Sequence, residues 1–201
     1  MPDTTAISAA PLADLGSLIG LSDAALLRLC RANRHLRIER DARGGLHIMA
    51  PAGSESSERN LDLAAQLWAW NRQSGLGHAF DSSGGFLLPD GSMRAADVAW
   101  IANARWAAVP AEERKRFAPV CPDFVIELLS PSDSLPQTQA KMRDWLANGA
   151  SCGLLIDPES RRVWRYRGDS AELFESVLRI EPDAERMPGF VLDLTMVFGG
   201  E

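Results

Sequence analysis

The chain has 201 residues, with 27 acidic against 21 basic side chains and a net charge of −6. Hydrophobic residues make up 46% of it and charged residues 24%, which is ordinary globular usage and excludes a disordered, collagen-like or coiled-coil chain. The acidic balance argues against avid non-specific DNA binding, because such binding requires a strongly basic domain. It does not exclude a local basic groove.

The cysteines and the N-terminal residues indicate in which cellular compartment the protein is expected. Cys30, Cys121 and Cys152 are widely spaced and form no C-x-x-C pair, so we expect neither a disulfide framework nor a zinc ribbon, and we expect a cytoplasmic protein. The apolar stretches fall short of the ~20 residues of a membrane helix, so we expect no membrane association. Residues 1–20 lack the basic start of a secretory signal, and they predict a flexible N-terminal arm before a single domain over residues 21–199.

The first elements after the arm are a helix and a hairpin. Ser22 is a good N-cap for a short amphipathic helix that ends near Asn33. Two segments of alternating polarity, 36–39 and 46–49, flank the turn-prone residues 41–45. This pattern predicts a β-hairpin.

A long helix and an antiparallel strand pair follow. Apolar residues at helical spacing predict a helix from about residue 54 to 74, which Gly75 ends. Residues 80–88 and 94–101 then predict two strands joined by the turn at 89–91.

The second half of the chain predicts further strands around one helix. Residues 106–116 are polar and predict a surface loop with a helical turn after Pro110. A second amphipathic helix is expected at residues 137–148, ended by Gly149. Strands are expected at 124–129, 152–156 and 163–166, with short extended pieces between 173 and 198. The order of elements predicts an α+β or mixed α/β fold with one central sheet.

Two acids stand in otherwise apolar predicted strands. Glu127 lies within the run FVIELL, and Asp97 lies within AADVAWI, one strand earlier. A buried carboxylate is costly without compensation, so each acid needs a base, solvent or a cation. Two acids that face the same way on neighbouring strands would suit a hard divalent ion such as Mg²⁺ or Mn²⁺. For either acid alone, an edge position or a salt bridge is the alternative.

Lysine is rare in this chain. Only Lys115 and Lys141 are lysines among the 21 basic residues, and a lysine supplies a compact ammonium whose pKa can shift on burial, which a guanidinium cannot do. Lys141 lies one turn before Trp145, at the border of the apolar stripe, from where its amine can reach inward. The alternative is an ordinary surface lysine.

The spaced motifs resemble a known family. Residues 94–100 read RAADVAW and residues 122–132 read PDFVIELLSPS. Together with the segments at 141–149, 155–158, 163–166 and 188–194, they resemble the Uma-two family of bacterial restriction-endonuclease-like proteins, in the PD-(D/E)XK nuclease superfamily. The resemblance runs from about residue 21 to 198. It implies a restriction-endonuclease-like mixed sheet flanked by helices, preceded by an N-terminal helix and β-hairpin, and a metal-dependent site that hydrolyses phosphodiester bonds of DNA.

The resemblance also implies site residues. Asp97 and Glu127 would be the two motif acids, and with Lys141 they would carry catalysis. The superfamily usually has a lysine two residues after the second acid, where this chain has Leu129. Members of the family lack that lysine too, and Lys141 in the following helix resembles a migrated substitute.

The resemblance also concerns an acid of the long helix and a glutamate of the hairpin. An acid from the long helix often completes such sites, so Glu55, chosen over Glu58, is expected to hold Mg²⁺ or Mn²⁺ together with the two motif acids. Glu39 resembles a glutamate common in the family. The alternative for Glu39 is an ion pair with Arg37 or Arg40.

A run of arginines in the first elements has two possible interpretations. Arginine recurs every third residue from Arg28 to Arg43, which suggests either a phosphate-contacting surface or, since the run crosses a helix-to-strand boundary, a solvated one.

We expect a homodimer, because cutting both strands of a duplex most simply uses two protomers. Its interface would lie at the helix around Leu26 and Leu29 or at the tail after Leu173, unless these faces pack on their own sheet. The alternatives to a nuclease are a catalytically inactive nuclease-fold binding module and a structural homo-oligomer.

Overall fold

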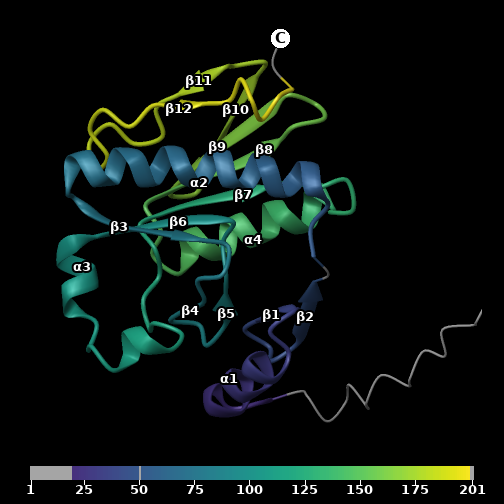
Figure 1. The fold of residues 1–201 in the computed structure, drawn as a ribbon, viewed down its shortest axis with the longest axis vertical. Helices are drawn as coiled ribbons and strands as arrows, with labels where there is room; N and C mark the ends of the chain where they lie inside the picture. The colour runs from purple at the N-terminus through teal and green to yellow at the C-terminus, as the bar shows by residue number, and fades with distance from the viewer. Residues whose placement is uncertain (1–19, 50, 200–201) are drawn as a thin grey trace, which may run out of the picture.

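A computed structural model describes residues 20–49 and 51–199. The fold is the mixed α+β fold that the sequence predicts, with helices on both sides of a central sheet (Figure 1). The expected N-terminal arm lies outside the described residues, except for Gly20. None of the helices in the described part of the chain combines the length and apolarity needed to cross a bilayer.

A six-stranded sheet forms the centre of the molecule, in the order β10-β9-β8-β7-β6-β3. All neighbouring strands are antiparallel except β7 and β8, which are parallel. A parallel pair needs a crossover connection, and the helix α4 (Leu135–Ala147) provides it. The strands are β3 (Gly77–Asp81), β6 (Val98–Ala102), β7 (Phe124–Leu128), β8 (Cys152–Asp157), β9 (Arg162–Arg167) and β10 (Ser170–Glu175).

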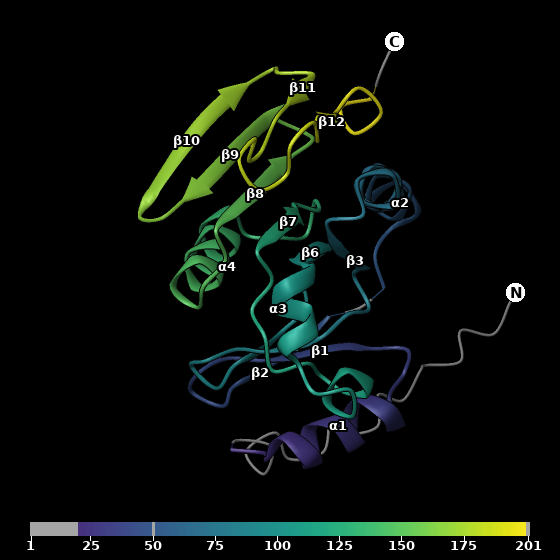
Figure 2. The same ribbon diagram turned by 90° about the vertical axis from the view of Figure 1, so that its left-hand side faces the viewer.

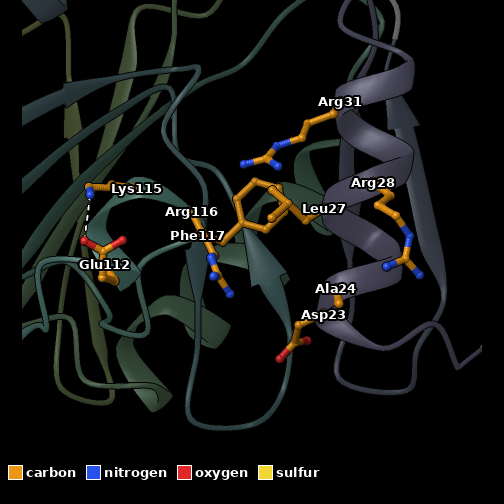
Figure 3. A pocket seen from close by; sticks show the side chains of 9 residues that line it. All are labelled: Asp23, Ala24, Leu27, Arg28, Arg31, Glu112, Lys115, Arg116 and Phe117. Carbon is orange, nitrogen blue, oxygen red and sulfur yellow. Dashed lines mark hydrogen bonds and ion pairs between the residues drawn. The ribbon is translucent and has the colours of Figure 1, made fainter.

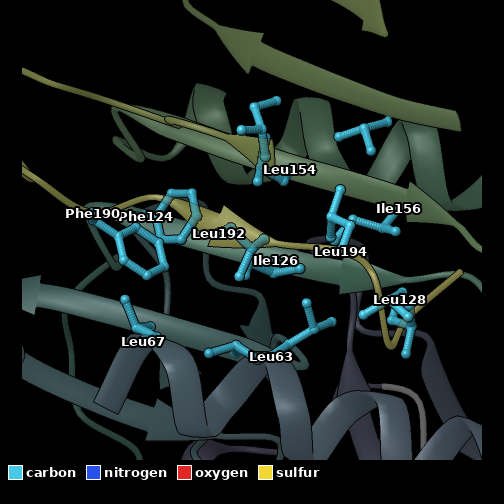
Figure 4. Close-up of a cluster of buried hydrophobic side chains, with 14 of the residues drawn as sticks. Leu63, Leu67, Phe124, Ile126, Leu128, Leu154, Ile156, Phe190, Leu192 and Leu194 are labelled. Carbon is cyan, nitrogen blue, oxygen red and sulfur yellow. The ribbon is translucent and has the colours of Figure 1, made fainter. Parts of the chain in front are cut away.

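Helix α2 (Ser54–Ser74) covers one face of this sheet and α4 covers the other. Leu63 and Leu67 of α2 pack against alternate residues of β7, among them Ile126 (Figure 4). Met142 of α4 packs on the opposite face against Val125. The side chains of β7 therefore alternate between the two cores, as the sequence predicts, and the α4 side is the side that receives Glu127.

A smaller sheet joins the N-terminal elements to the hairpin that follows β3. Its order is β2-β1-β5-β4, and Figure 2 shows β1 and β2 lying between α1 and the main sheet. Leu26 of the helix is fully buried against Ile38 and Met93 of this sheet. The new elements are α1 (Asp23–Ala32), β1 (Arg37–Arg40), β2 (Leu46–Met49), β4 (Phe86–Leu87) and β5 (Met93–Arg94).

The caps and apolar faces of the helices explain where they form. Ser22 accepts a hydrogen bond from the backbone N–H of Ala25, so it caps α1 as predicted. Gly75 adopts the left-handed conformation that ends α2. The apolar face of α1 around Leu26 and Leu29 packs on its own sheet, so the first of the two expected dimer interfaces is not exposed.

Two expected strands divide into shorter ones. Residues 80–88 contain the end of β3 and the separate strand β4, while residues 94–101 contain the end of β5 and most of β6. The chain passes from one sheet to the other at these breaks, and Asp81 caps the first of them by accepting hydrogen bonds from Ser83. Apolar residues continue through both breaks. The sequence therefore predicts one strand where the structure has two strands in different sheets.

The expected loop at residues 106–116 is helical at both ends. Its first residues belong to α3 (Asn103–Ala108), which the sequence analysis missed, and a 3₁₀ turn, η2 (Glu113–Lys115), follows Pro110 as predicted. The Trp106 ring packs edge-on against the Phe80 ring with centroids 5.1 Å apart. This tertiary contact favours the helix in a segment whose polar composition suggests a loop.

The tail ends against the core. Two short strands, β11 (Arg179–Ile180) and β12 (Leu192–Asp193), pair antiparallel. Phe190 and Leu194 join the core under α2, while Leu173 and Met196 remain exposed.

Candidate active site

The candidate site lies where the main sheet meets the small sheet, at the end of β7. Glu127 is fourth in that strand and almost completely buried. Helix α4 faces it with Lys141 and Trp145, one helical turn apart. The indole Nε1–H of Trp145 donates to Oε1 of Glu127 over 2.8 Å. The helix thus supplies both an ammonium and a neutral donor to one buried carboxylate.

Lys141 is held entirely by oxygen atoms. Its Nζ donates to Oε2 of Glu127 at 3.1 Å, to Oε1 of Glu39 at 3.0 Å and to the carbonyl of Ala95 at 3.0 Å. Only 15% of its side chain is exposed. Lys141 is therefore a buried cation that reaches inward, and the surface-lysine alternative is wrong.

Glu39 belongs to the same cluster and is 2% exposed. Besides Lys141, it contacts Arg37 at 3.4 Å and Arg94 at 3.5 Å. Of the two partners considered from the sequence, Arg37 is a partner of Glu39, whereas Arg40 pairs with Asp23 at 2.6 Å. Glu39 therefore links the small sheet to Lys141 of α4 and, through Lys141, to Glu127 of the main sheet.

Asp97 immediately precedes β6, and both of its carboxylate oxygens are bonded. Oδ1 accepts from Nη1 of Arg37 at 2.7 Å, and Oδ2 accepts from the backbone N–H of Leu128 at 2.8 Å. The register pairs Val98 with Ile126, so one step further Asp97 stands opposite Glu127. The two motif acids are cross-strand neighbours on the face that α4 covers, as the sequence predicts.

Burial and charge together set the protonation of the cluster. Burial raises the pKa of Glu127 to about 7, with Lys141 acting against the rise and the charge of Asp97 adding to it. For Lys141, burial acts to lower the pKa, but the carboxylates of Glu127 and Glu39 outweigh it and the pKa rises. Burial likewise opposes ionisation of Glu39, but Lys141, Arg37 and Arg94 bring its pKa below the ordinary value. Lys141 and Glu39 are therefore charged at neutral pH, while Glu127 is close to its titration point.

Glu55 stands apart from this cluster. It lies in the first turn of α2, on the helix that covers the other face of the sheet, and its carboxylate pairs with Arg59 at 2.6 Å. Its side chain is 76% exposed. The structure brings Asp97, Glu127 and Lys141 together, and it adds Glu39 to them rather than Glu55.

The residue types fit a divalent metal ion, but their present contacts do not form a ready metal site. Carboxylate and carbonyl oxygens are the ligands that Mg²⁺ and Mn²⁺ prefer, and Glu39, Asp97 and Glu127 supply them. Within residues 20–49 and 51–199, however, no three acidic, histidine or cysteine side chains converge as metal ligands. The carboxylates are occupied by Arg37, Lys141, Trp145 and backbone N–H groups, so an ion has to replace at least one of these partners.

Sequence reasoning did not assign the arginines of the site. Arg37 contacts Asp97, Glu39 and the carbonyl of Ala95. Arg94 contacts Glu39 and also Asp144 of α4, the latter at 3.0 Å. The available signal was the position of Arg94, three residues before Asp97 in the RAAD motif. For Arg37 the sequence indicated only an ion pair with Glu39, because only the fold brings β1 close to Asp97.

A second feature is a basic groove of about 610 Å³ between α1 and the segment after η2 (Figure 3). Arg28 and Arg31 line it from the helix, and Arg116 lines it from the other side. Asp23 pairs with Arg40 outside the lining, and Glu112 pairs with Lys115, which also lines the groove, so neither acid of the lining pairs with one of its three arginines. The groove is therefore positively charged in a chain whose net charge is −6.

Comparisons with known proteins agree with the fold and with the motifs. The Uma2 family model, described as "Putative restriction endonuclease", matches residues 23–195. No curated protein matches the chain significantly. A crystal structure from Anabaena variabilis ATCC 29413, described as "a putative nuclease belonging to DUF820", is similar with a TM-score of 0.66 and 22% identity, covering 80% of this chain and 89% of that one. The structural likeness shows a shared fold, and the family match extends over most of the chain: the chain belongs to the Uma2, or Uma-two, family.

Proposed function

We propose that this chain is a Mg²⁺- or Mn²⁺-dependent nuclease that hydrolyses phosphodiester bonds of DNA. The observation that carries the proposal is the contact of Lys141 with both Glu127 and Glu39, beside Asp97. A lysine next to two neighbouring acids at a strand end is the arrangement that the family resemblance implies, even though Leu129 occupies the usual lysine position. Here the helix α4 supplies the ammonium instead.

The side chains have distinct roles in this proposal. Asp97 and Glu127 would hold the ion, which would polarise the scissile phosphate and lower the pKa of a bound water molecule. Lys141 stays protonated, because two carboxylates face it, and its charge would stabilise the negative charge that develops on the phosphate. Trp145 fixes the orientation of the Glu127 carboxylate through its N–H.

The third metal ligand stays a proposal. Glu55 is the residue predicted from the sequence, but its carboxylate pairs with Arg59, whereas Glu39 already lies in the cluster. Titrating Glu55→Gln and Glu39→Gln with Mn²⁺ separates the two. If Glu55 is a ligand, Glu55→Gln weakens the binding of Mn²⁺ at least tenfold, and an unchanged affinity contradicts its role.

The basic groove supports nucleic acid as the substrate. Arg28, Arg31 and Arg116 offer guanidinium groups with no ion-pair partner among the described residues, and guanidinium groups bind phosphate well. Neutralising all three by substitution with alanine should weaken binding to a DNA duplex and reduce the salt dependence of binding. Equal binding by the triple variant would show that the groove is not a DNA contact.

A cleavage assay tests the activity directly. Supercoiled plasmid and single-stranded DNA are incubated with the protein and Mg²⁺ or Mn²⁺, and the same assay is run with Asp97→Ala and Lys141→Ala. Both variants should lose at least a hundredfold in rate. The matched control is Glu175→Ala, because Glu175 is an exposed acid on the edge strand β10. Robust cleavage by Asp97→Ala would overturn the assignment.

An inactive binding module is the second candidate, and two observations favour it. Leu129 occupies the usual lysine position, and every carboxylate of the cluster already has protein partners. Calorimetric titration with Mn²⁺, with and without DNA, separates the candidates. Measurable affinity supports the nuclease, and its absence under both conditions supports the binding module.

We also propose that the protein is a cytoplasmic homodimer. Its three cysteines are free, which suits a reducing compartment. Leu173 and Met196 expose apolar surface on the tail, where the second of the two predicted interfaces lies. Sedimentation equilibrium at micromolar protein should give twice the monomer mass. A monomer mass at all concentrations would contradict the dimer and also the structural homo-oligomer.

A further inference from the structure

Arg37 is the cluster residue that solvent reaches most easily. Its side chain is 26% exposed, against 15% for Asp97 and 2% for Glu39. Its guanidinium contacts Oδ1 of Asp97 at 2.7 Å, and it also contacts Glu39 and the carbonyl of Ala95. A positive charge therefore lies directly on the carboxylate that a metal ion needs.

Asp97 has only one oxygen that can be released. Oδ2 accepts the backbone N–H of Leu128, and this bond is part of the connection between Asp97 and β7. Oδ1 is bonded to a side chain alone. A divalent ion that binds Asp97 through Oδ1 therefore competes with Arg37 for that oxygen, because two cations at contact distance repel each other strongly.

Two features of Arg37 favour its release. Its Nε is buried without a hydrogen-bond partner, which is an unfavourable state for a donor. The side chain belongs to the first residue of β1 in the small sheet, so its movement leaves the main sheet intact. Lys141 is also held by three oxygen atoms, but its side chain is less exposed, at 15% against 26% for Arg37.

We propose that Arg37 is a gate on the metal site that becomes a ligand of the substrate phosphate. Without metal, the guanidinium of Arg37 supplies the positive charge beside the Asp97 carboxylate. When the ion binds, Arg37 releases Oδ1, and the freed guanidinium binds the scissile phosphate, for which its planar set of donors is well suited. This inference rests on the proposed nuclease function.

Arg94 provides the matched control. It is a buried arginine of the same cluster, it also pairs with Glu39, and its Nε also lacks a partner. Its second partner is Asp144 rather than Asp97. Replacing either arginine removes one positive charge near the acids, but only the replacement of Arg37 releases Asp97.

The test measures metal affinity and cleavage separately. Calorimetric titration with Mn²⁺, without DNA, compares the wild type with Arg37→Met, Arg37→Gln and Arg94→Met, each confirmed as folded by circular dichroism. Both Arg37 variants should bind Mn²⁺ about tenfold more tightly, and Arg94→Met should change the affinity less than threefold. At saturating Mn²⁺ the Arg37 variants should cleave DNA at least tenfold more slowly.

The opposite signs of these two effects distinguish the proposal from a structural role, which would weaken both properties. Unchanged or weaker Mn²⁺ binding by the Arg37 variants overturns the gate, and undiminished cleavage overturns the phosphate contact. If no form binds Mn²⁺ with or without DNA, the proposed nuclease function fails together with the inference. Mn²⁺ binding by the wild type that does not respond to the Arg37 substitutions overturns the inference alone.

Discussion

Lys141 on α4 donates a hydrogen bond over 3.0 Å to Glu39 on β1, a residue 102 positions earlier in the chain. The same ammonium contacts Glu127 on β7. One lysine thus connects the small sheet, the main sheet and the helix between β7 and β8. The candidate chemistry and the attachment of the two sheets depend on the same side chain.

Lys141→Met should destabilise the protein by about 3–5 kcal/mol, because it leaves two buried carboxylates without their shared cation. Urea unfolding at pH 7 measures the change. The control is Lys115→Met, since Lys115 pairs with Glu112 on the exposed surface and should cost no more than about 0.5 kcal/mol. The double variant Lys141→Met/Glu127→Gln should have a free energy of unfolding at least about 1 kcal/mol higher than Lys141→Met alone. A loss for Lys141→Met as small as that of the control would contradict this role.

Trp145→Phe removes the N–H that bonds to the Glu127 carboxylate. Hydrogen bonds to charged groups contribute more than neutral ones, so we expect a loss of about 2 kcal/mol in the free energy of unfolding and a rise of the Glu127 pKa above its value of about 7. Trp100→Phe is the matched control, because Trp100 is equally buried and donates to the neutral amide of Asn71 at the same 2.8 Å. Equal losses in the two variants would show that the charge of Glu127 is unimportant.

Glu39→Gln should change how stability depends on pH. Burial opposes the charge of Glu39, but the surrounding bases lower its pKa, so its contribution is present above the unfolded pKa of about 4.3 and is lost as the pH falls below that value. The variant should be less stable than the wild type by about 3 kcal/mol at pH 7, and the difference should shrink by more than half at pH 3. Glu175→Gln, at an exposed ion pair, should show no such trend. A constant difference for Glu39→Gln would contradict the lowered pKa.

Gly77→Ala should destabilise the edge of the main sheet by about 1–3 kcal/mol, because a Cβ at this position would overlap the carbonyl oxygen of Ile101 and the Trp100 ring. Thermal unfolding measures the effect. Gly53→Ala, where a Cβ meets nothing within 4 Å, should cost less than about 1 kcal/mol, the range of a lost helix cap. A larger loss of stability for Gly53→Ala than for Gly77→Ala would contradict the expectation that close packing at Gly77 excludes a side chain.

The elements with strong local signals were predicted correctly. Ser22 and Gly75 determine helix ends through their own caps, and the apolar run of β7 shows its burial on both faces. The same alternation places Glu127 on one face of that strand, and helical spacing places Lys141 beside Trp145. These features depend on neighbours within one or two turns, which the sequence displays directly.

Other features depend on contacts between distant segments. The chain changes sheets within residues 80–101, so continuous apolar patterns hid the breaks around β4 and β5. Glu55 has the residue type and the helix that the family resemblance implies, yet its helix covers the opposite face of the sheet from Lys141.

By itself, the sequence determined the fold class, most helices and strands, and the placement of Asp97 and Glu127 on one face of neighbouring strands, and the family resemblance added Lys141 to these acids. Only the tertiary structure decided that Glu39 joins them and that Arg37 covers Asp97. The physical reason is that a buried charge is stabilised by whichever opposite charges the packing of distant elements brings within a few ångströms. Periodicity and spacing along the chain do not contain that information.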